Sequence, residues 1–147
     1  MSVNVVASSA TSNFKIVRLS MADFIKIYVQ MVGKTDLAGT TKEFFNAYDL
    51  WTKSHVYKVP SGYIRIEPYP RLKSATIHGF FTGNPFRDSE NIKSVLNYYL
   101  KRHPEMSHLE CHVKNEFRGV KRFVANLAHS SEYRDGKWIF YYRRDKE

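Results

Sequence analysis

The spacing of apolar residues along the chain changes from a helical period to a strand period and back. Residues 1–13 are small and polar, with neither period, and predict a flexible N-terminal lead. Residues 14–19 alternate between apolar and basic side chains, which predicts a half-buried strand. Apolar residues three and four apart follow the N-cap signals Ser20 and Thr40, so we expect a helix after each. A period of two then predicts three antiparallel strands, over residues 55–59, 63–67 and 74–81.

The second half of the chain alternates helices with strands. An apolar stripe predicts a helix that begins at Asp88 or Ser89 and stops before Pro104. Residues 107–113 follow as a strand, and residues 116–128 predict another amphipathic helix. The pattern after this helix returns to strands.

Asp135-Gly136 is the strongest short-range turn signal in the sequence. It joins residues 130–134 and 137–143, two strand-like segments, as a hairpin. The complete order is β-α-α-β-β-β-α-β-α-β-β, which predicts an α+β fold: one mainly antiparallel, twisted sheet with helices on both faces. We expect residues 14–147 to form this single domain.

The composition fits a folded, basic domain. Apolar residues make up 43% of the 147 residues, enough for a core, and the formal net charge is +9. Cys111 is the single cysteine, and no Cys/His pairs have ligand spacing, so we expect neither a disulfide nor a metal site. The single cysteine fits an intracellular or virion setting. The sequence shows no run of 18 apolar residues and no signal-peptide pattern, so we expect a protein that is neither secreted nor in a membrane.

Two segments carry a resemblance to a known family. Residues 14–24, FKIVRLSMADF, resemble the first strand and acid-bearing first helix of the GNAT family, the Gcn5-related N-acetyltransferases. Residues 115–128 and the segment SEYRDG at 131–136 are similar to the family's last helix and closing hairpin. The resemblance covers roughly residues 14–144 and implies the GNAT fold. It looks closest to GNAT-like proteins of tailed bacteriophages, some of which are internal virion or head-assembly proteins.

The resemblance also locates the segment that would bind acetyl-CoA. In the family, a glycine-rich loop that opens the third helix holds the pyrophosphate with backbone N–H groups. If acetyl-CoA binds, the matching residues are Arg87, Ser89, Asn91 and Ile92. However, Pro85 removes a backbone donor, and the carboxylates of Asp88 and Glu90 lie where phosphate would sit. Residues 83–113 carry four basic and four acidic side chains, so they have no excess charge and we expect no cofactor.

The acid and base positions of the family are also altered. The tyrosine that usually protonates the leaving thiolate falls at Phe123 or Val124, and neither side chain can donate a proton. If the chain is an enzyme, Glu67 and His78 are the candidate bases and Tyr133 is a candidate acid. The alternatives are a solvated Glu67 at a strand end, a hydrogen-bonded His78 and a Tyr133 that packs in the hairpin.

Basic side chains form a second candidate site. Arg118, Lys121 and Arg122 share one helix face, and Arg143 and Arg144 follow two tyrosines near the end of the chain. Together they predict a surface for nucleic acid or another anionic partner. The alternative is that the helix residues are the solvated side of an amphipathic helix.

The histidines do not predict a metal site. His108 and His112 lie on the same face of a predicted strand, about 13 Å apart at ~3.3 Å per residue, which is too far to share an ion. Cys111 points to the other face and is expected to be a small core residue.

Three functions remain open. We favour a structural or interaction protein of a virion or its assembly, with a protein partner in the larger assembly. The alternatives are an active N-acetyltransferase that moves an acetyl group from acetyl-CoA to an amine, and a basic nucleic-acid-binding module. The gap between strands 74–81 and 107–113 distinguishes the structural role from the acetyltransferase. Splayed strands with free backbone donors favour the enzyme, whereas a gap filled by Phe81, Phe86 or His112 favours the structural role.

Overall fold

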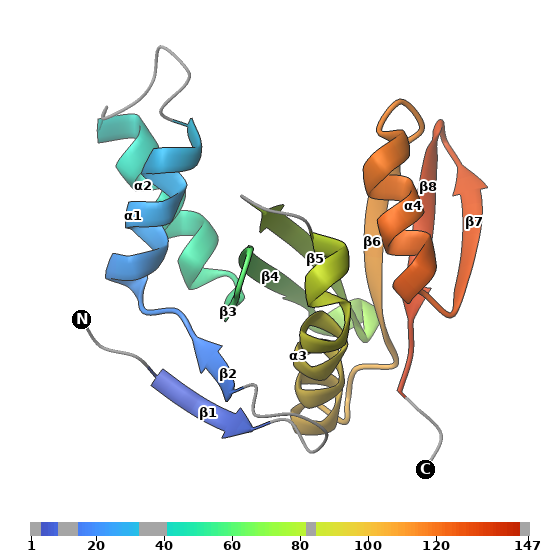
Figure 1. Cartoon of the computed structure of the whole chain (residues 1–147), viewed down its shortest axis with the longest axis horizontal. Helices are drawn as coiled ribbons and strands as arrows, with labels where there is room; N and C mark the ends of the chain where they lie inside the picture. Colours follow the sequence, from blue (N-terminus) through green and yellow to red (C-terminus); the bar gives the residue numbers. More distant parts are fainter. Residues whose placement is uncertain (1–3, 9–14, 33–40, 82–84, 145–147) are drawn as a thin grey trace.

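The computed structural model describes residues 4–8, 15–32, 41–81 and 85–144. Its strands are β1 (Asn4–Ser8), β2 (Lys15–Arg18), β3 (His55–Val59), β4 (Gly62–Tyr69), β5 (Ser74–Phe81), β6 (His108–Lys114), β7 (Ser130–Arg134) and β8 (Lys137–Tyr142). Its helices are α1 (Met21–Val32), α2 (Thr41–Thr52), α3 (Ser89–Arg102) and α4 (Arg118–Leu127), with 3₁₀ turns η1 (Pro70–Leu72) and η2 (Pro85–Asp88). This order confirms the predicted α+β arrangement and adds one strand at its start (Figure 1).

The described strands form one eight-stranded sheet in the order β1-β2-β3-β4-β5-β6-β8-β7. Neighbouring strands are antiparallel except for β5 and β6, which run parallel. Helix α3 lies in the connection between these two strands, because parallel neighbours need a long crossover. The sheet is therefore mainly antiparallel, as predicted, with its parallel pair between the antiparallel parts.

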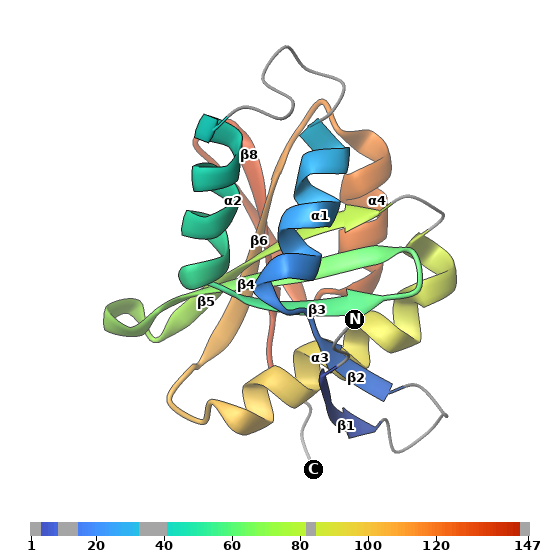
Figure 2. The same ribbon diagram turned by 90° about the vertical axis from the view of Figure 1, so that its left-hand side faces the viewer.

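Helices cover both faces of the sheet, and alternation divides the strand residues between two cores. Phe24 of α1 and Ala47 of α2 pack with Val56 and Tyr63 on one face. Figure 2 shows α1 and α2 in front of the sheet, with α4 behind it. The core under α3 and α4 includes Ile64, Ile66, Tyr99, Leu109 and Phe123. The predicted cover on both faces is confirmed.

Two local sequence signals act as expected. The backbone N–H of Asp23 donates to Ser20 Oγ at 3.2 Å, which caps the start of α1. Asp135 and Gly136 have φ values of 55° and 78°, the left-handed pair that a type I′ hairpin turn requires. The second expected cap, at Thr40, lies outside the described residues.

Strand β1 corrects the expectation of a flexible lead over residues 1–13. It pairs antiparallel with β2, with a register irregularity midway. The segment NVVAS has no period of two, so its own pattern gives no strand signal; the edge of β2 supplies the hydrogen bonds that hold it. Residues 1–3 and 9–13 lie outside the described part of the chain, and the domain boundary at residue 14 stays a prediction.

A partly buried histidine at the start of β3 makes stability depend on pH. Burial, and then the positive charges of Arg18 and His103, lower the pKa of His55 to about 4. Between about pH 6.5 and 4 the unfolded chain binds a proton at His55 that the folded chain does not, so the free energy of unfolding falls as the pH falls. Allowing for partial solvation, we expect a loss of about 2 kcal/mol across this window in urea denaturation, and a smaller loss in His55→Gln. Equal losses in the two proteins would contradict this assignment.

Candidate functional site

Strands β5 and β6 separate partway along their length. Their pairing ends at Thr76 opposite Glu110, yet β5 continues to Phe81 and β6 continues to Lys114. Beyond this point, the backbone groups of β5 that face β6 have no strand partner among the described residues. Figure 1 shows the two strands diverging. The structure therefore has the splayed strands that favour an enzyme.

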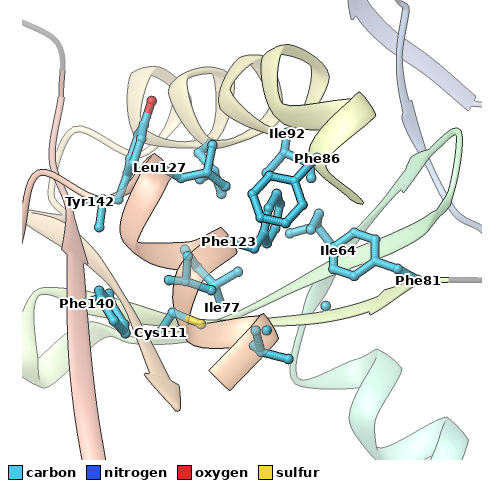
Figure 3. Close-up of a pocket in the computed structure, with 16 residues that line it drawn as sticks. Ile64, Ile77, Phe81, Phe86, Ile92, Cys111, Phe123, Leu127, Phe140 and Tyr142 are labelled. Atoms are coloured by element: carbon cyan, nitrogen blue, oxygen red, sulfur yellow. The ribbon is translucent and has the colours of Figure 1, made fainter. Parts of the chain in front are cut away.

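An apolar cavity of about 380 Å³ lies at this separation, on the face covered by α3 and α4. Ile77 and Gly79 of β5 line it, together with Cys111 of β6, Phe123 of α4 and Ile92 of α3. Figure 3 shows side chains arranged around the cavity from the sheet and from both helices. The described residues that line it include no charged side chain, so the cavity suits an apolar group.

The three side chains whose position in the gap would favour a structural role do not close it. Phe81 and Phe86 each meet Phe123 edge to face, with ring centroids 5.8 and 5.2 Å apart, and form an aromatic wall of the cavity (Figure 3). Phe86 is 44% exposed, so this wall reaches the surface. His112 belongs to the other face of β6, where it contacts Glu110. The cavity thus has a mouth at its aromatic end.

The polar atoms on the cavity wall are not reactive ones. Burial raises the pKa of the Cys111 thiol to about 11, so it is neutral at pH 7 and a poor nucleophile. Phe123 and Val124, at the position of the family's tyrosine, both line the cavity. Tyr142 brings a hydroxyl to the wall, but this group donates to Asn97 Oδ1 at 2.7 Å and points toward α3 (Figure 3).

The opposite face of the same strands is polar. His78 alternates with Ile77 and Gly79 along β5, so its ring lies on the face away from the cavity. The register places His78 opposite Arg65 of β4, two residues from Glu67. The structure therefore brings the two candidate bases, Glu67 and His78, onto one face.

Two donors hold the carboxylate of Glu67. Arg65 Nη1 donates to Oε1 at 2.9 Å, and the Tyr69 hydroxyl donates to Oε2. The hydrogen bond from Tyr69 is the main reason that the pKa of Glu67 is lowered, and Arg65 acts in the same direction against burial. A carboxylate stabilised in this way is a weak base. Glu67 is thus neither a free base nor an isolated solvated side chain; it places negative charge near His78.

His78 is the better placed base. It is exposed at the surface, yet the protein atoms crowded around its ring lower the pKa of its imidazole, as do Arg65 and His112, while Glu67 acts in the opposite direction. Within the described part of the chain, its ring nitrogens take part in no hydrogen bond, which differs from the hydrogen-bonded alternative considered above. The neutral imidazole is therefore free to accept a proton at pH 7.

A second acidic group on this face was not predicted. His108 Nε2 and His112 Nε2 lie 2.8 and 3.0 Å from the two carboxylate oxygens of Glu110. Burial would raise the pKa of Glu110, but the hydrogen bonds to both histidines outweigh it and lower the pKa. The alternation His-x-Glu-x-His along a strand was the available signal. His108 and His112 do share a face, as predicted, and a carboxylate joins them.

Tyr133 lies apart from these groups. It sits on β7 opposite Trp138, which in turn pairs with Val113, so it belongs to the side of the sheet that carries the cavity. Its ring meets the Trp138 ring edge to face, with centroids 5.4 Å apart. The residue Tyr133 as a whole is 55% exposed. The structure does not bring Tyr133 to Glu67 and His78.

At the start of α3, the carboxylate of Asp88 does not point to the position where phosphate would sit. Asp88 is buried, and its carboxylate accepts hydrogen bonds from the backbone N–H of Ser61, at 2.8 Å, and from the Ser61 hydroxyl. It makes no capping hydrogen bond to α3. Glu90 is exposed and lies 3.7 Å from Lys93 Nζ. Asp88 therefore ties α3 to the β3–β4 turn, 27 residues away, instead of covering the end of the helix.

The predicted phosphate-binding residues differ in their surroundings. Arg87 is exposed, and the Ser89 hydroxyl donates to the Phe86 carbonyl oxygen at 2.8 Å. Asn91 is partly buried, whereas Ile92 is buried and lines the cavity. Their roles in binding acetyl-CoA stay predictions.

Two further features of the described residues concern a metal site and a membrane-spanning helix. These contain no group of three or more His, Cys, Asp or Glu side chains that could hold a metal ion. No helix within them is long and apolar enough to cross a membrane.

No protein-family model matches the sequence, and no curated protein matches it. The structure, however, resembles solved acetyltransferases. A spermidine N-acetyltransferase SpeG mutant from Vibrio cholerae is 13% identical, with a TM-score of 0.65 over 88% of this chain and 95% of that one. RimL, a ribosomal L7/L12 alpha-N-protein acetyltransferase in complex with coenzyme A, is 10% identical, with a TM-score of 0.65 over 97% of this chain and 99% of RimL. An acetyltransferase from Agrobacterium tumefaciens is 11% identical, with a TM-score of 0.60 over 88% and 91%. The topology, the splayed strands and these likenesses show that the chain has the fold of the Gcn5-related N-acetyltransferases.

Proposed function

We propose that the chain transfers an acyl group, in the simplest case acetyl, from acyl-CoA to an amine. The solved proteins that share its fold are acetyltransferases, which favours this alternative over the virion role that the sequence alone favoured. None of these three is named for a bacteriophage, virion or head-assembly role, and that interpretation stays a prediction, as does a protein partner. The coenzyme A bound to RimL likewise favours an acyl-CoA ligand over the expected absence of a cofactor.

One observation carries this proposal. The separation of β5 and β6 places an apolar cavity on one face of the sheet and a neutral histidine on the other. Ile77 and Gly79 line the cavity, and His78 between them lies on the opposite face. A thioester that enters the gap from the α3 and α4 side would therefore meet an amine that approaches from the side of His78.

The chain's own groups fit the arm of an acyl-CoA. Beyond Thr76, the unpaired backbone edge of β5 can hydrogen-bond an extended, amide-containing chain, as a sheet edge does with a peptide. The apolar lining suits the methylene and acyl groups of the arm. Because Asp88 is turned to Ser61, its carboxylate does not cap the first turn of α3.

His78 supplies the base in this mechanism. The amine nitrogen attacks the thioester carbonyl carbon, the carbon–sulfur bond breaks, and the amine proton passes to the neutral imidazole. Glu67 stabilises the resulting imidazolium electrostatically. The thiolate then takes up a proton from solvent and the imidazolium of His78 releases its proton to solvent, so the products are an amide and a free thiol and the base is neutral again.

The proposal predicts thiol release from acetyl-CoA that requires both the protein and an amine. We expect calorimetry to show binding of acetyl-CoA in the micromolar range, and a thiol-trapping assay to show turnover with at least one member of a panel of polyamines, peptide N-termini and lysine peptides. Binding without turnover on any amine would contradict catalysis but retain the cavity as an acyl-CoA site. Absence of binding at millimolar acetyl-CoA would contradict both and return the structural role to first place.

A further inference from the structure

A hollow of about 970 Å³ lies on the outer side of α4, where this helix meets the end of β6 and the turn between β7 and β8. We name it the basic hollow, after the five cationic side chains that line it: Lys114, Arg118, Lys121, Arg122 and Lys137. Its acidic lining residues are Glu116 and Asp135, so the hollow carries a net charge of 5 − 2 = +3.

The charges of the basic hollow are not neutralised within the described part of the chain. None of the five cations forms an ion pair there, although Lys93 pairs with Glu90, and Arg134 with Glu132, elsewhere on the surface. Cations gathered in one concave surface repel one another and raise the local concentration of anions. An anionic ligand with several charges is therefore the chemistry that fits this surface.

The structure separates the basic residues that the sequence pattern grouped. Arg144 donates to the carbonyl oxygens of Leu100 and His103, which ties the end of β8 to the end of α3. Arg143 donates to Ser130 Oγ. The strand between Lys137 and Arg143 spans about 20 Å, at ~3.3 Å per residue, so both arginines lie outside the basic hollow.

Aromatic side chains adjoin the basic hollow. Lys121 Nζ lies 4.4 Å from the centroid of the Trp138 ring, and Trp138 Nε1 donates to Asn115 Oδ1 at 3.2 Å. Tyr133 packs against Trp138 and remains 55% exposed. Bases of a single strand stack on exposed aromatic rings beside a cationic groove, whereas an acidic peptide has no group that needs such a ring.

We propose that the basic hollow binds single-stranded nucleic acid, with its five cations on phosphates and Tyr133 as a stacking platform. The basic hollow is distinct from the acyl-CoA cavity, because the two sites use different residues of α4. Gly119, Val120 and Phe123 line the cavity, whereas Arg118 and its basic neighbours line the hollow. The inference therefore does not depend on the transferase proposal.

The salt dependence of binding tests this assignment. Fluorescence anisotropy with a labelled 12-nucleotide single strand should give a slope of log K against log salt of about −3.5 if five phosphates are contacted, and about −1.4 in Arg118→Gln/Lys121→Gln/Arg122→Gln. Between 50 and 200 mM salt these slopes correspond to losses of about 100-fold and about 7-fold. The variant Lys26→Gln/Lys58→Gln/Lys101→Gln changes the net charge equally at exposed positions outside the hollow, and should keep the slope of the native chain.

A second variant distinguishes nucleic acid from other polyanions. Tyr133→Ala should weaken binding of the oligonucleotide by about 5- to 100-fold without changing the salt slope, and leave binding of inorganic polyphosphate unchanged. Equal slopes in the two triple variants, both shown to be folded by circular dichroism, would overturn the site. Tighter binding of polyphosphate or of poly-glutamate than of the oligonucleotide would overturn the choice of ligand.

Discussion

Replacement of His78 by glutamine is expected to lower the rate of acetyl transfer by about 10²- to 10⁴-fold, because the amide cannot accept the amine proton. The binding of acetyl-CoA should stay within about twofold, since His78 lies on the face away from the cavity. Stability should change little, because the ring makes no hydrogen bond within the described residues. Thiol release and calorimetry on the same preparation measure both quantities.

The pH profile separates a base from a residue that only shapes the site. The protein atoms around its ring, Arg65 and His112 lower the pKa of His78 and Glu67 raises it, so that the pKa lies below its ordinary value of 6.5. The native rate should therefore be constant near pH 7 and fall as the pH falls through this lowered pKa, whereas the residual rate of His78→Gln should lack that limb. His129→Gln, at an exposed histidine beside β7, serves as the control and should keep both rate and profile. If the rate of His78→Gln still falls at low pH as the native rate does, another group is the base, and Glu110 is the next candidate.

Most of the fold was predictable because its signals are local. Alternating apolar residues located β3 and β5 at their observed bounds, and the Asp135-Gly136 turn located the closing hairpin. Strand β1 was not predictable in this way, since the partner edge of β2 holds a segment with no pattern of its own. Local patterns thus identify elements that carry their own hydrophobic face, and miss an element that depends on an edge.

The candidate site was predictable only in part, because it depends on contacts between distant residues. Alternation put Glu67 and His78 on strands, but the hydrogen bonds of Glu67 and the open position of His78 depend on neighbouring side chains. Asp88 was correctly placed at the start of α3, yet its carboxylate accepts hydrogen bonds from Ser61, 27 residues away, and makes no capping bond to the helix. No sequence period reports such a contact.

Substitution of Gly79 by valine is expected to weaken acetyl-CoA binding by about 10- to 100-fold, or about 1.4 to 2.8 kcal/mol. A Cβ atom at this position would lie 2.7 and 2.9 Å from Cε2 and Cζ of Phe81, closer than van der Waals contact allows. The end of the Phe81 ring has to move, and since Phe81 lines the cavity, its ring and the valine methyl groups would occupy space that the ligand needs. Calorimetry with acetyl-CoA measures the loss.

Gly119 provides the matched control, because it lines the same cavity from α4 but has room for a side chain. A Cβ atom there would have no heavy atom within 4 Å beyond its chain neighbours and the nearby backbone of its own helix. Gly119→Ala should therefore leave acetyl-CoA binding unchanged and stabilise the helix by about 0.5–1 kcal/mol, since alanine restricts the unfolded backbone more than glycine does. Equal affinities of the two variants would mean that the ligand does not enter between β5 and α4. A loss of affinity confined to Gly79→Val, with its melting temperature retained, would locate the acyl-CoA arm where β5 and β6 separate.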